Sequence, residues 1–187
     1  MRNIVLVKHA KPEQVEGKPS HDWPLSAAGR EKCVPLAEKL AKYAPAAIVS
    51  SSEPKALESA QIIGEKIGAA VDVIDGLHEH DRINVPLMRT GEFISMMALF
   101  FKQPTRCVLG RESAAEALER FEDAFDAAAR KYPTGNLIVV THGTVLALYL
   151  AKHCAVNGYE TWRAMGLPSY VAIDDASHKI TDRADGV

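Results

Sequence analysis

Two histidines stand just after short apolar runs, where polar turns begin. The run Ile4–Val7 is followed after one residue by His9, and the run Leu137–Val140 is followed after one residue by His142. Both runs have the length and composition of buried strands, and open α/β sheets bind ligands at the carboxyl ends of their strands. A neutral imidazole is nucleophilic near neutral pH without help from a strong base. The two positions therefore predict a site at one edge of a sheet.

Three charged residues extend this candidate site. Lys8 precedes His9, Lys55 follows a second strand, and Glu79 follows a third. A phosphoryl group in transfer spreads negative charge over its oxygens, and two lysines and a protonated His142 would stabilise that charge. If burial or the phosphate raised its pKa, Glu79 would give a proton to the leaving oxygen and later activate water. We therefore predict phosphoryl transfer with His9 as the nucleophile.

The neighbours of Glu79 leave two alternatives open. Asp81 is a second candidate for the acid. His78 and His80 can share one face of an extended segment and ligate zinc or iron, although such a metal site would not explain the lysines or the two strand-end histidines. The other histidines and the cysteines have no partner motif, and we assign them no role: His21, His153, His178, Cys33, Cys107 and Cys154.

The elements that must position these residues alternate between strand and helix along the chain. This order is typical of a mainly parallel sheet with helices on both faces, so we predict an α/β fold, a three-layer α/β/α sandwich. Ser26 is a candidate N-cap, and Ser113 with Glu116 forms a capping box. A strand at 170–173 is expected to pair with 178–180, and the tail after residue 181 to fray. We expect strands at 4–7, 46–49, 71–74 and 137–140, and helices at 27–43, 54–67 and 113–132.

Composition limits the function classes. The chain has 187 residues, of which 47% are hydrophobic, and this is enough to bury one core, so we expect a single domain spanning 1–187. A net charge of −2 with scattered basic residues argues against nucleic acid and anionic membranes as partners. The three cysteines lack the spacing of a zinc site. The first apolar run is too short for a signal peptide or a membrane span, so we expect a cytoplasmic protein.

Ile83 to Gly110 interrupts the alternation of strands and helices with a segment rich in Met and Phe. This segment can be a lid over the site, or it can pack its apolar side chains on the core. Together with the loop from Lys11 to Asp22, it is where we expect substrate selectivity to reside.

These residues also occur in motifs that resemble the histidine phosphatase superfamily, also called phosphoglycerate mutase-like. Six stretches follow the family's order over nearly the whole chain: Leu6 to Ala10, Pro24 to Gly29, Ser50 to Ala56, Leu77 to Glu79, Gly110 to Ser113, and Val139 to Gly143. The resemblance implies a phosphoglycerate mutase-like fold and a metal-free, cofactor-free phosphatase acting on a small phosphorylated substrate. It also implies a phosphorylated His9, phosphate binding by His142, Lys8 and Lys55, and acid catalysis by Glu79.

The sequence departs from the family pattern at the cations. Lysine stands at positions 8 and 55, where the family has arginine. Lysine binds phosphate as a point charge and lacks the planar fork that grips two oxygens. We therefore expect a working phosphatase of reduced activity, in which arginine at either position would raise phosphate affinity. Ala10 replaces a glycine of the first motif, and the Gly-x-x-Glu-Gly stretch that follows the acid in the family is absent.

Two other function classes stay open. A pseudoenzyme that binds a phosphate ligand or a partner would bind phosphate or vanadate without turnover. A mutase would return the phosphoryl group to a second hydroxyl, which requires long capping loops, and this chain has only modest stretches in the relevant places. We therefore favour hydrolysis.

Overall fold

The computed structural model describes residues 2–187 and builds them around one six-stranded sheet, ordered β3-β2-β4-β1-β5-β6. The first four strands are parallel, and the last two run antiparallel to their neighbours. The sheet is therefore mainly parallel, as expected. The strands are β1 (Asn3–Lys8), β2 (Ala47–Ser50), β3 (Val71–Val73), β4 (Leu137–Thr141), β5 (Ser169–Asp174) and β6 (Ile180–Ala184).

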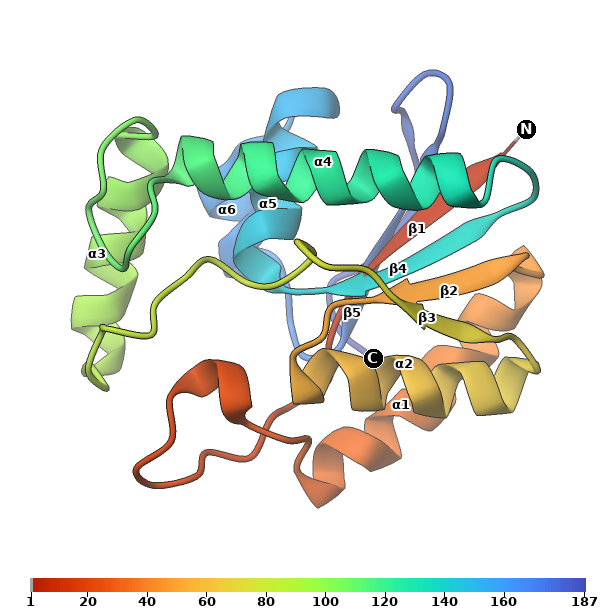
Figure 1. The fold of residues 1–187 in the computed structure, drawn as a ribbon, viewed down its shortest axis with the longest axis horizontal. Helices are drawn as coiled ribbons and strands as arrows, with labels where there is room; N and C mark the ends of the chain where they lie inside the picture. The colour runs from red at the N-terminus through yellow and green to blue at the C-terminus, as the bar shows by residue number, and fades with distance from the viewer. Residues whose placement is uncertain (1) are drawn as a thin grey trace.

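Helices cover both faces of the sheet, which confirms the three-layer sandwich (Figure 1). Successive side chains of β1 point to opposite faces, so Val5 and Val7 pack in the core on the α1 and α2 side, whereas Ile4 and Leu6 pack on the α4 and α5 side. No helix within residues 2–187 is long and apolar enough to cross a membrane. The helices are α1 (Ala27–Leu40), α2 (Pro54–Ile67), α3 (Thr90–Lys102), α4 (Ala114–Lys131), α5 (Gly143–His153) and α6 (Gly158–Ala164).

The predicted helix starts are confirmed, and one helix end differs. The Ser26 hydroxyl caps α1, and Ser113 with Glu116 forms the complete capping box of α4. Helix α1 ends at Leu40 rather than at residue 43, because Ala41–Tyr43 tightens into a 3-10 turn. Such tightening is common in the last turn of a helix.

The prediction that the chain frays after residue 181 was wrong. Residues Ile180–Ala184 form β6, so the hairpin partner of β5 begins where the predicted partner, 178–180, ends. Residues in β6 alternate between half-buried and exposed, which is the pattern of an edge strand with few apolar residues. The Asp182 carboxylate fixes this edge, since it accepts hydrogen bonds from Lys42 at 2.7 Å and from the hydroxyls of Tyr43 and Tyr170 at 2.8 Å.

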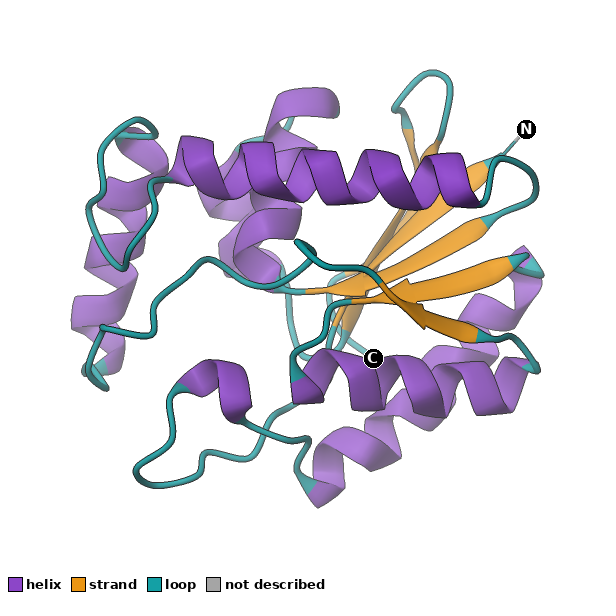
Figure 2. Cartoon of the chain, in the orientation of Figure 1, coloured by secondary structure: helices purple, strands orange, loops and turns teal. Residues whose placement is uncertain are grey.

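The Met- and Phe-rich segment folds into α3, which stands at one end of the sandwich (Figure 2). Met97 and Phe100 are fully buried in the core beneath α4 and α5. Phe93 and Phe101 are half-buried and contact Trp162 of α6 edge-on or tilted. The packing interpretation of this segment is confirmed, whereas its role as a lid stays a prediction.

Candidate active site

The parallel pairing of β1 with β4 places the two predicted histidines side by side. Lys8 is in register with Thr141, so the residues that follow, His9 and His142, leave the sheet at the same edge. The His9 amide donates to the Thr141 carbonyl at 3.0 Å. The two imidazole rings meet edge to face with their centroids 5.1 Å apart. His142 is completely buried, and 7% of His9 is exposed.

One ring nitrogen of His9 is held and the other is free to react. Nδ1 lies 2.7 Å from the Ala10 carbonyl oxygen, which can only accept a hydrogen bond, so Nδ1 carries the proton. Nε2 therefore presents its lone pair. Burial lowers the pKa of His9 well below its ordinary value, and the charges of His142 and Lys55 add to this effect. The ring is neutral, as a nucleophile for phosphorus must be.

Lys55 lies in the first turn of α2 and is buried with Glu53, the residue that precedes this helix. The Lys55 ammonium donates to the Glu53 carboxylate and, at 2.7 Å, to the Ser20 carbonyl. The other oxygen of Glu53 accepts from the Glu79 amide at 2.8 Å. This carboxylate thus ties together a cation, a loop and the segment that carries the candidate acid.

Lys8 is the second cation of the site, and it is half-buried. Its ammonium donates to the Met165 carbonyl at 2.9 Å. Gly143 lies beside it, and a Cβ there would be 3.0 Å from Cε of Lys8, so a larger residue would require the lysine side chain to shift. Burial lowers the pKa of Lys8, and the nearby Glu79 carboxylate acts in the opposite direction.

The Glu79 carboxylate binds to the amino terminus of α5. It accepts hydrogen bonds from the amides of Thr144 at 3.1 Å and Val145 at 3.3 Å, and from the amide of His80 at 2.9 Å. Helix amino termini favour negative charge, so these donors compensate for burial of the carboxylate. Arg82 lies 3.7 Å from the same carboxylate.

Two expectations about protonation fail in this arrangement. Burial would raise the pKa of Glu79, but the charge of Arg82, the charge that His142 has when it is protonated, and the backbone amides act against burial and hold that pKa well below its ordinary value. Burial, followed by the charge of Lys55, lowers the pKa of His142. Glu79 is therefore ionised and His142 is neutral. Glu79 can hold a proton for the leaving group only when the negative charge of a bound substrate phosphate raises the pKa of this carboxyl.

His142 also has a partner that the sequence analysis missed. Nε2 of His142 lies 2.9 Å from the Ser51 hydroxyl and 3.6 Å from the Glu53 carboxylate. Nδ1 is buried and has no hydrogen-bond partner among the described residues. The ring is thus fixed in orientation through Nε2.

The neighbours of Glu79 face other groups. Oδ2 of Asp81 accepts two hydrogen bonds from Arg111, from Nη2 at 2.6 Å and from Nε at 2.9 Å. Nε2 of His80 lies 2.9 Å from the Glu112 carbonyl, and the His80 ring packs on Phe100. Across residues 2–187, no group of three or more His, Cys, Asp or Glu residues is arranged to hold a metal ion. Asp81 is bound by Arg111, whereas the Glu79 carboxylate lies at the amino terminus of α5, which His142 directly precedes.

A cavity of about 300 Å³ opens beside Glu79, and the other candidate site residues, His9, His142, Lys8 and Lys55, are not among the described residues that line it. Its lining includes Glu53, Glu79 and Arg82, of which sequence reasoning identified Glu79 alone. Arg82 lies three residues after the predicted acid, and Glu53 lies two residues before the predicted cation. The signal that the sequence offered for Arg82 and Glu53 was that each lies close to a predicted site residue. The contact of Glu53 with Lys55 and that of Arg82 with Glu79 depend on how the loops meet in the fold.

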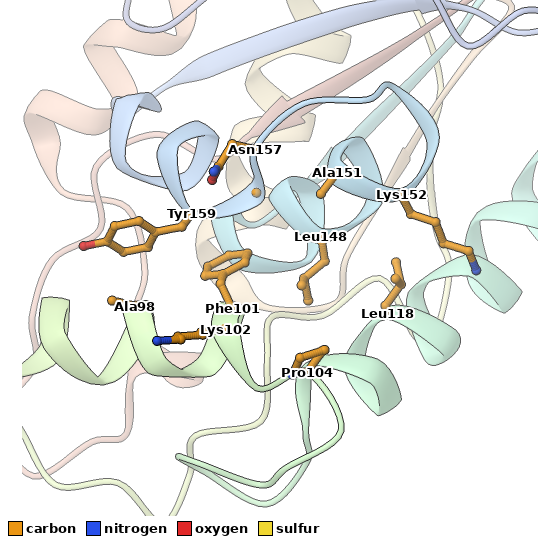
Figure 3. A pocket seen from close by; sticks show the side chains of 11 residues that line it. Ala98, Phe101, Lys102, Pro104, Leu118, Leu148, Ala151, Lys152, Asn157 and Tyr159 are labelled. Carbon is orange, nitrogen blue, oxygen red and sulfur yellow. The ribbon is translucent and has the colours of Figure 1, made fainter.

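A larger cavity, of about 540 Å³, lies among α3, α4, α5 and α6 (Figure 3). Phe101, Leu148 and Tyr159 line it, and Lys152 at its rim is paired with Glu122. None of the candidate catalytic residues lines this cavity. The chemistry of the side chains, rather than the size of the cavity, therefore locates the active site.

Comparison with known proteins identifies the family. Residues 4–177 match the family described as histidine phosphatase superfamily, branch 1. Glucosyl-3-phosphoglycerate phosphatase of Mycolicibacterium vanbaalenii is 28% identical over 210 residues, which cover 100% of this chain and 88% of the relative.

Solved structures share the fold. A mycobacterial glucosyl-3-phosphoglycerate phosphatase is 21% identical with a TM-score of 0.78, covering 100% of this chain and 99% of the other. A phosphoserine phosphatase mutant from Entamoeba histolytica is 16% identical with a TM-score of 0.77, covering 98% and 96%. The chain thus belongs to the histidine phosphatase superfamily and is a phosphoric monoester hydrolase of that type.

Proposed function

We propose that the protein hydrolyses phosphomonoesters through a phosphohistidine on Nε2 of His9, with water as the final acceptor. The observation that carries this proposal is the geometry of His9. Its Nδ1 is held by the Ala10 carbonyl, and its neutral ring stands against His142 at a buried edge of the sheet. Lys8 and Lys55 supply the positive charge that a phosphoryl group requires.

In the first step, Nε2 of His9 attacks phosphorus and the bond between phosphorus and the leaving oxygen breaks. Lys8, Lys55 and His142 stabilise the charge on the phosphoryl oxygens. The phosphate brings negative charge next to Glu79, which raises the pKa of this carboxyl so that it takes up a proton. Glu79 then gives that proton to the leaving oxygen.

In the second step, the ionised Glu79 accepts a proton from a water molecule. The oxygen of that water attacks phosphorus, the bond between phosphorus and Nε2 breaks, and inorganic phosphate leaves. His9 returns to its neutral state with the proton still on Nδ1. All groups in this cycle belong to the protein, so we propose neither a metal nor a cofactor.

We also propose a small phosphorylated molecule as the substrate, with no nucleic acid or membrane partner, and a cytoplasmic location. The net charge of −2 and the cavity of about 300 Å³ beside Glu79 support a small substrate. The named relatives act on glucosyl-3-phosphoglycerate and phosphoserine. We propose one domain over residues 1–187, in which the segment 83–110 also serves as a lid.

The test is hydrolysis of para-nitrophenyl phosphate between about pH 4 and 8, a range that brackets ordinary carboxyl and imidazole pKa values. The assay contains EDTA and compares the wild type with His9→Ala. His153→Gln is a matched control, because His153 is paired with Glu122 at the far end of α5. Turnover that survives EDTA and His153→Gln but is lost in His9→Ala supports the proposal. Turnover that survives His9→Ala contradicts it.

A protein that binds phosphate without turnover is the second candidate. The pairing of Lys55 with Glu53 favours it, since this lysine is already neutralised in part. Calorimetric binding of vanadate with no hydrolysis of any phosphoester would support this second function. A mutase is separated from both by a coupled assay, because a mutase isomerises phosphoglycerate rather than releasing inorganic phosphate.

A further inference from the structure

A second cavity, of about 360 Å³, adjoins the cavity beside Glu79. The two cavities share Ser20 and Arg82 in their linings. The second cavity lies between the loop that carries Lys18 and Trp23 and the segment that leads into α3. The leaving group of a phosphoester whose leaving oxygen lies beside Glu79 can therefore extend into it.

The lining of this second cavity has a distinct composition. Among the described residues, it contains two cations, Lys18 and Arg82, and no carboxylate. Leu87 is 81% exposed, which is unusual for a side chain of its size. The indole Nε1 of Trp23 donates to the Lys18 carbonyl at 3.0 Å, which fixes the orientation of this ring. The other apolar members are Val85, Met88 and Phe93.

Arg82 is loosely held where the two cavities meet. Its guanidinium carbon lies 5.2 Å from the centroid of the Phe93 ring. One terminal nitrogen is 3.3 Å from the Thr144 hydroxyl, and the other is 3.7 Å from the Glu79 carboxylate. Arg111, by contrast, makes two short bonds to its own aspartate. A guanidinium has five N–H donors, so Arg82 keeps donors free for a ligand.

We propose that Arg82 binds a carboxylate on the leaving group of the substrate, while the apolar part of that group lies against Trp23 and Phe93. The planar fork of arginine matches a carboxylate, and no acidic residue is among the described residues that line the second cavity, whereas Glu79 lies 3.7 Å from Arg82 on the side of the first cavity. The proposal rests on the proposed phosphatase function and assigns its substrate class, a phosphomonoester of an apolar hydroxy acid.

A pair of isosteric substrates tests this assignment. 4-Carboxybenzyl phosphate and 4-carbamoylbenzyl phosphate differ in charge but hardly in size. We expect kcat/KM of the wild type to favour the carboxylate by about tenfold, the effect of one charge-assisted hydrogen bond. Arg82→Gln brings the ratio close to one, and Arg82→Lys gives an intermediate ratio because it keeps the charge and loses the fork. Arg89→Gln, an exposed neighbour outside the lining, keeps the wild-type ratio.

The ratio of the two kcat/KM values distinguishes a specificity role of Arg82 from an indirect effect of Arg82 on Glu79. An effect on the acid lowers turnover of both substrates alike and leaves the ratio unchanged. A wild-type ratio of one or less, or a ratio that Arg82→Gln leaves unchanged, overturns the assignment. Hydrolysis of para-nitrophenyl phosphate in the same preparations keeps the two proposals distinguishable. Loss of that activity in the wild type refutes the phosphatase function, whereas activity with a ratio of one refutes the role of Arg82 alone.

Discussion

Two polar networks at different places in the molecule use charge in opposite ways. In the first, the half-buried Asp182 accepts bonds from Lys42, Tyr43 and Tyr170, so its charge is satisfied by short bonds. Lys42, together with the two hydroxyls, lowers the pKa of Asp182 to about 2. Lys42 and Tyr43 belong to the 3-10 turn after α1 and Tyr170 belongs to β5, so the network fastens the edge strand β6 to the body of the fold.

The second network, at the carboxyl edge of the sheet, combines two different cations: Lys55 is paired with Glu53, whereas Lys8 makes no ion pair among the described residues. The ammonium of Lys8 has a backbone carbonyl as its hydrogen-bond partner, and the histidines remain neutral because burial opposes their charge. Burying charge and polar groups without full compensation costs stability. The comparison teaches that the charges of the first network are paired with one another, whereas the second network has positive charge available for an added anion.

Glu79→Gln should have the largest effect among the carboxylate variants. We expect kcat for an alkyl phosphate to fall by about 10²- to 10⁴-fold, the usual contribution of a general acid. The loss should be smaller for para-nitrophenyl phosphate, whose leaving group needs less protonation. Asp81→Asn is the matched control, because Asp81 is paired with Arg111. A larger loss in Asp81→Asn than in Glu79→Gln would transfer the role of acid to Asp81.

The pH dependence of stability sharpens the contrast between the networks. The folded-state pKa values of His9 and His142 are depressed, so their contribution to stability is present above the unfolded value near pH 6.5 and is lost as the pH falls. We expect a loss of about 1.4 kcal/mol per pH unit from each ring, measured by urea unfolding between about pH 6.5 and 5.

The matched variants assign this slope to individual rings. His9→Gln should reduce it by about one proton, since glutamine does not titrate. Asp182→Ala should leave the slope unchanged, because the pKa of Asp182, about 2, lies below that pH window in the folded protein and an ordinary unfolded aspartate titrates near pH 3.9. An unchanged slope in His9→Gln would show that this ring is not held neutral by burial.

Asp182→Ala should affect stability without affecting catalysis. We expect the free energy of unfolding to fall by about 1 to 3 kcal/mol, because hydroxyl donors of Tyr43 and Tyr170 lose a charged acceptor. Thermal unfolding and kcat/KM measured on the same preparation check this. A fall in kcat/KM at a temperature where the variant is folded would mean that the two networks are coupled.

Lys55→Arg should have the smallest effect, in the direction of a gain. We expect inorganic phosphate to inhibit about threefold more strongly, since the arginine fork binds two oxygens where lysine binds as a point charge. Lys55→Gln should weaken the inhibition. If Lys55→Arg gives no gain, the geometric argument about lysine at this position is wrong.

The part of the site whose residues directly follow strands could be predicted from the sequence. His9 and His142 each follow a buried strand, and parallel pairing of those strands is enough to bring the rings together. The caps of α1 and α4 were readable for a similar reason, because the capping side chains act over three residues. Local patterns of this kind do not depend on the rest of the fold.

The remaining features depend on distant contacts. Glu53 has a role because the loop at Ser20 and the segment at Glu79 both meet it. The ionised state of Glu79 results from the amino terminus of α5 and from Arg82. Strand β6 looked like a polar tail because the anchor of Asp182 comes from residues about 140 positions away. Charge balance at a buried point cannot be inferred from the residues beside it in sequence.

Identification of the phosphorylated nitrogen tests the mechanism most directly. The protein is quenched during turnover of a ³²P-labelled phosphoester at alkaline pH, digested, and its phosphohistidine separated by isomer. Because Nδ1 of His9 donates to the Ala10 carbonyl, we expect phosphate on Nε2 of His9 and none in His9→Ala. Phosphate on Nδ1, on another residue, or on no residue during active turnover would contradict the account.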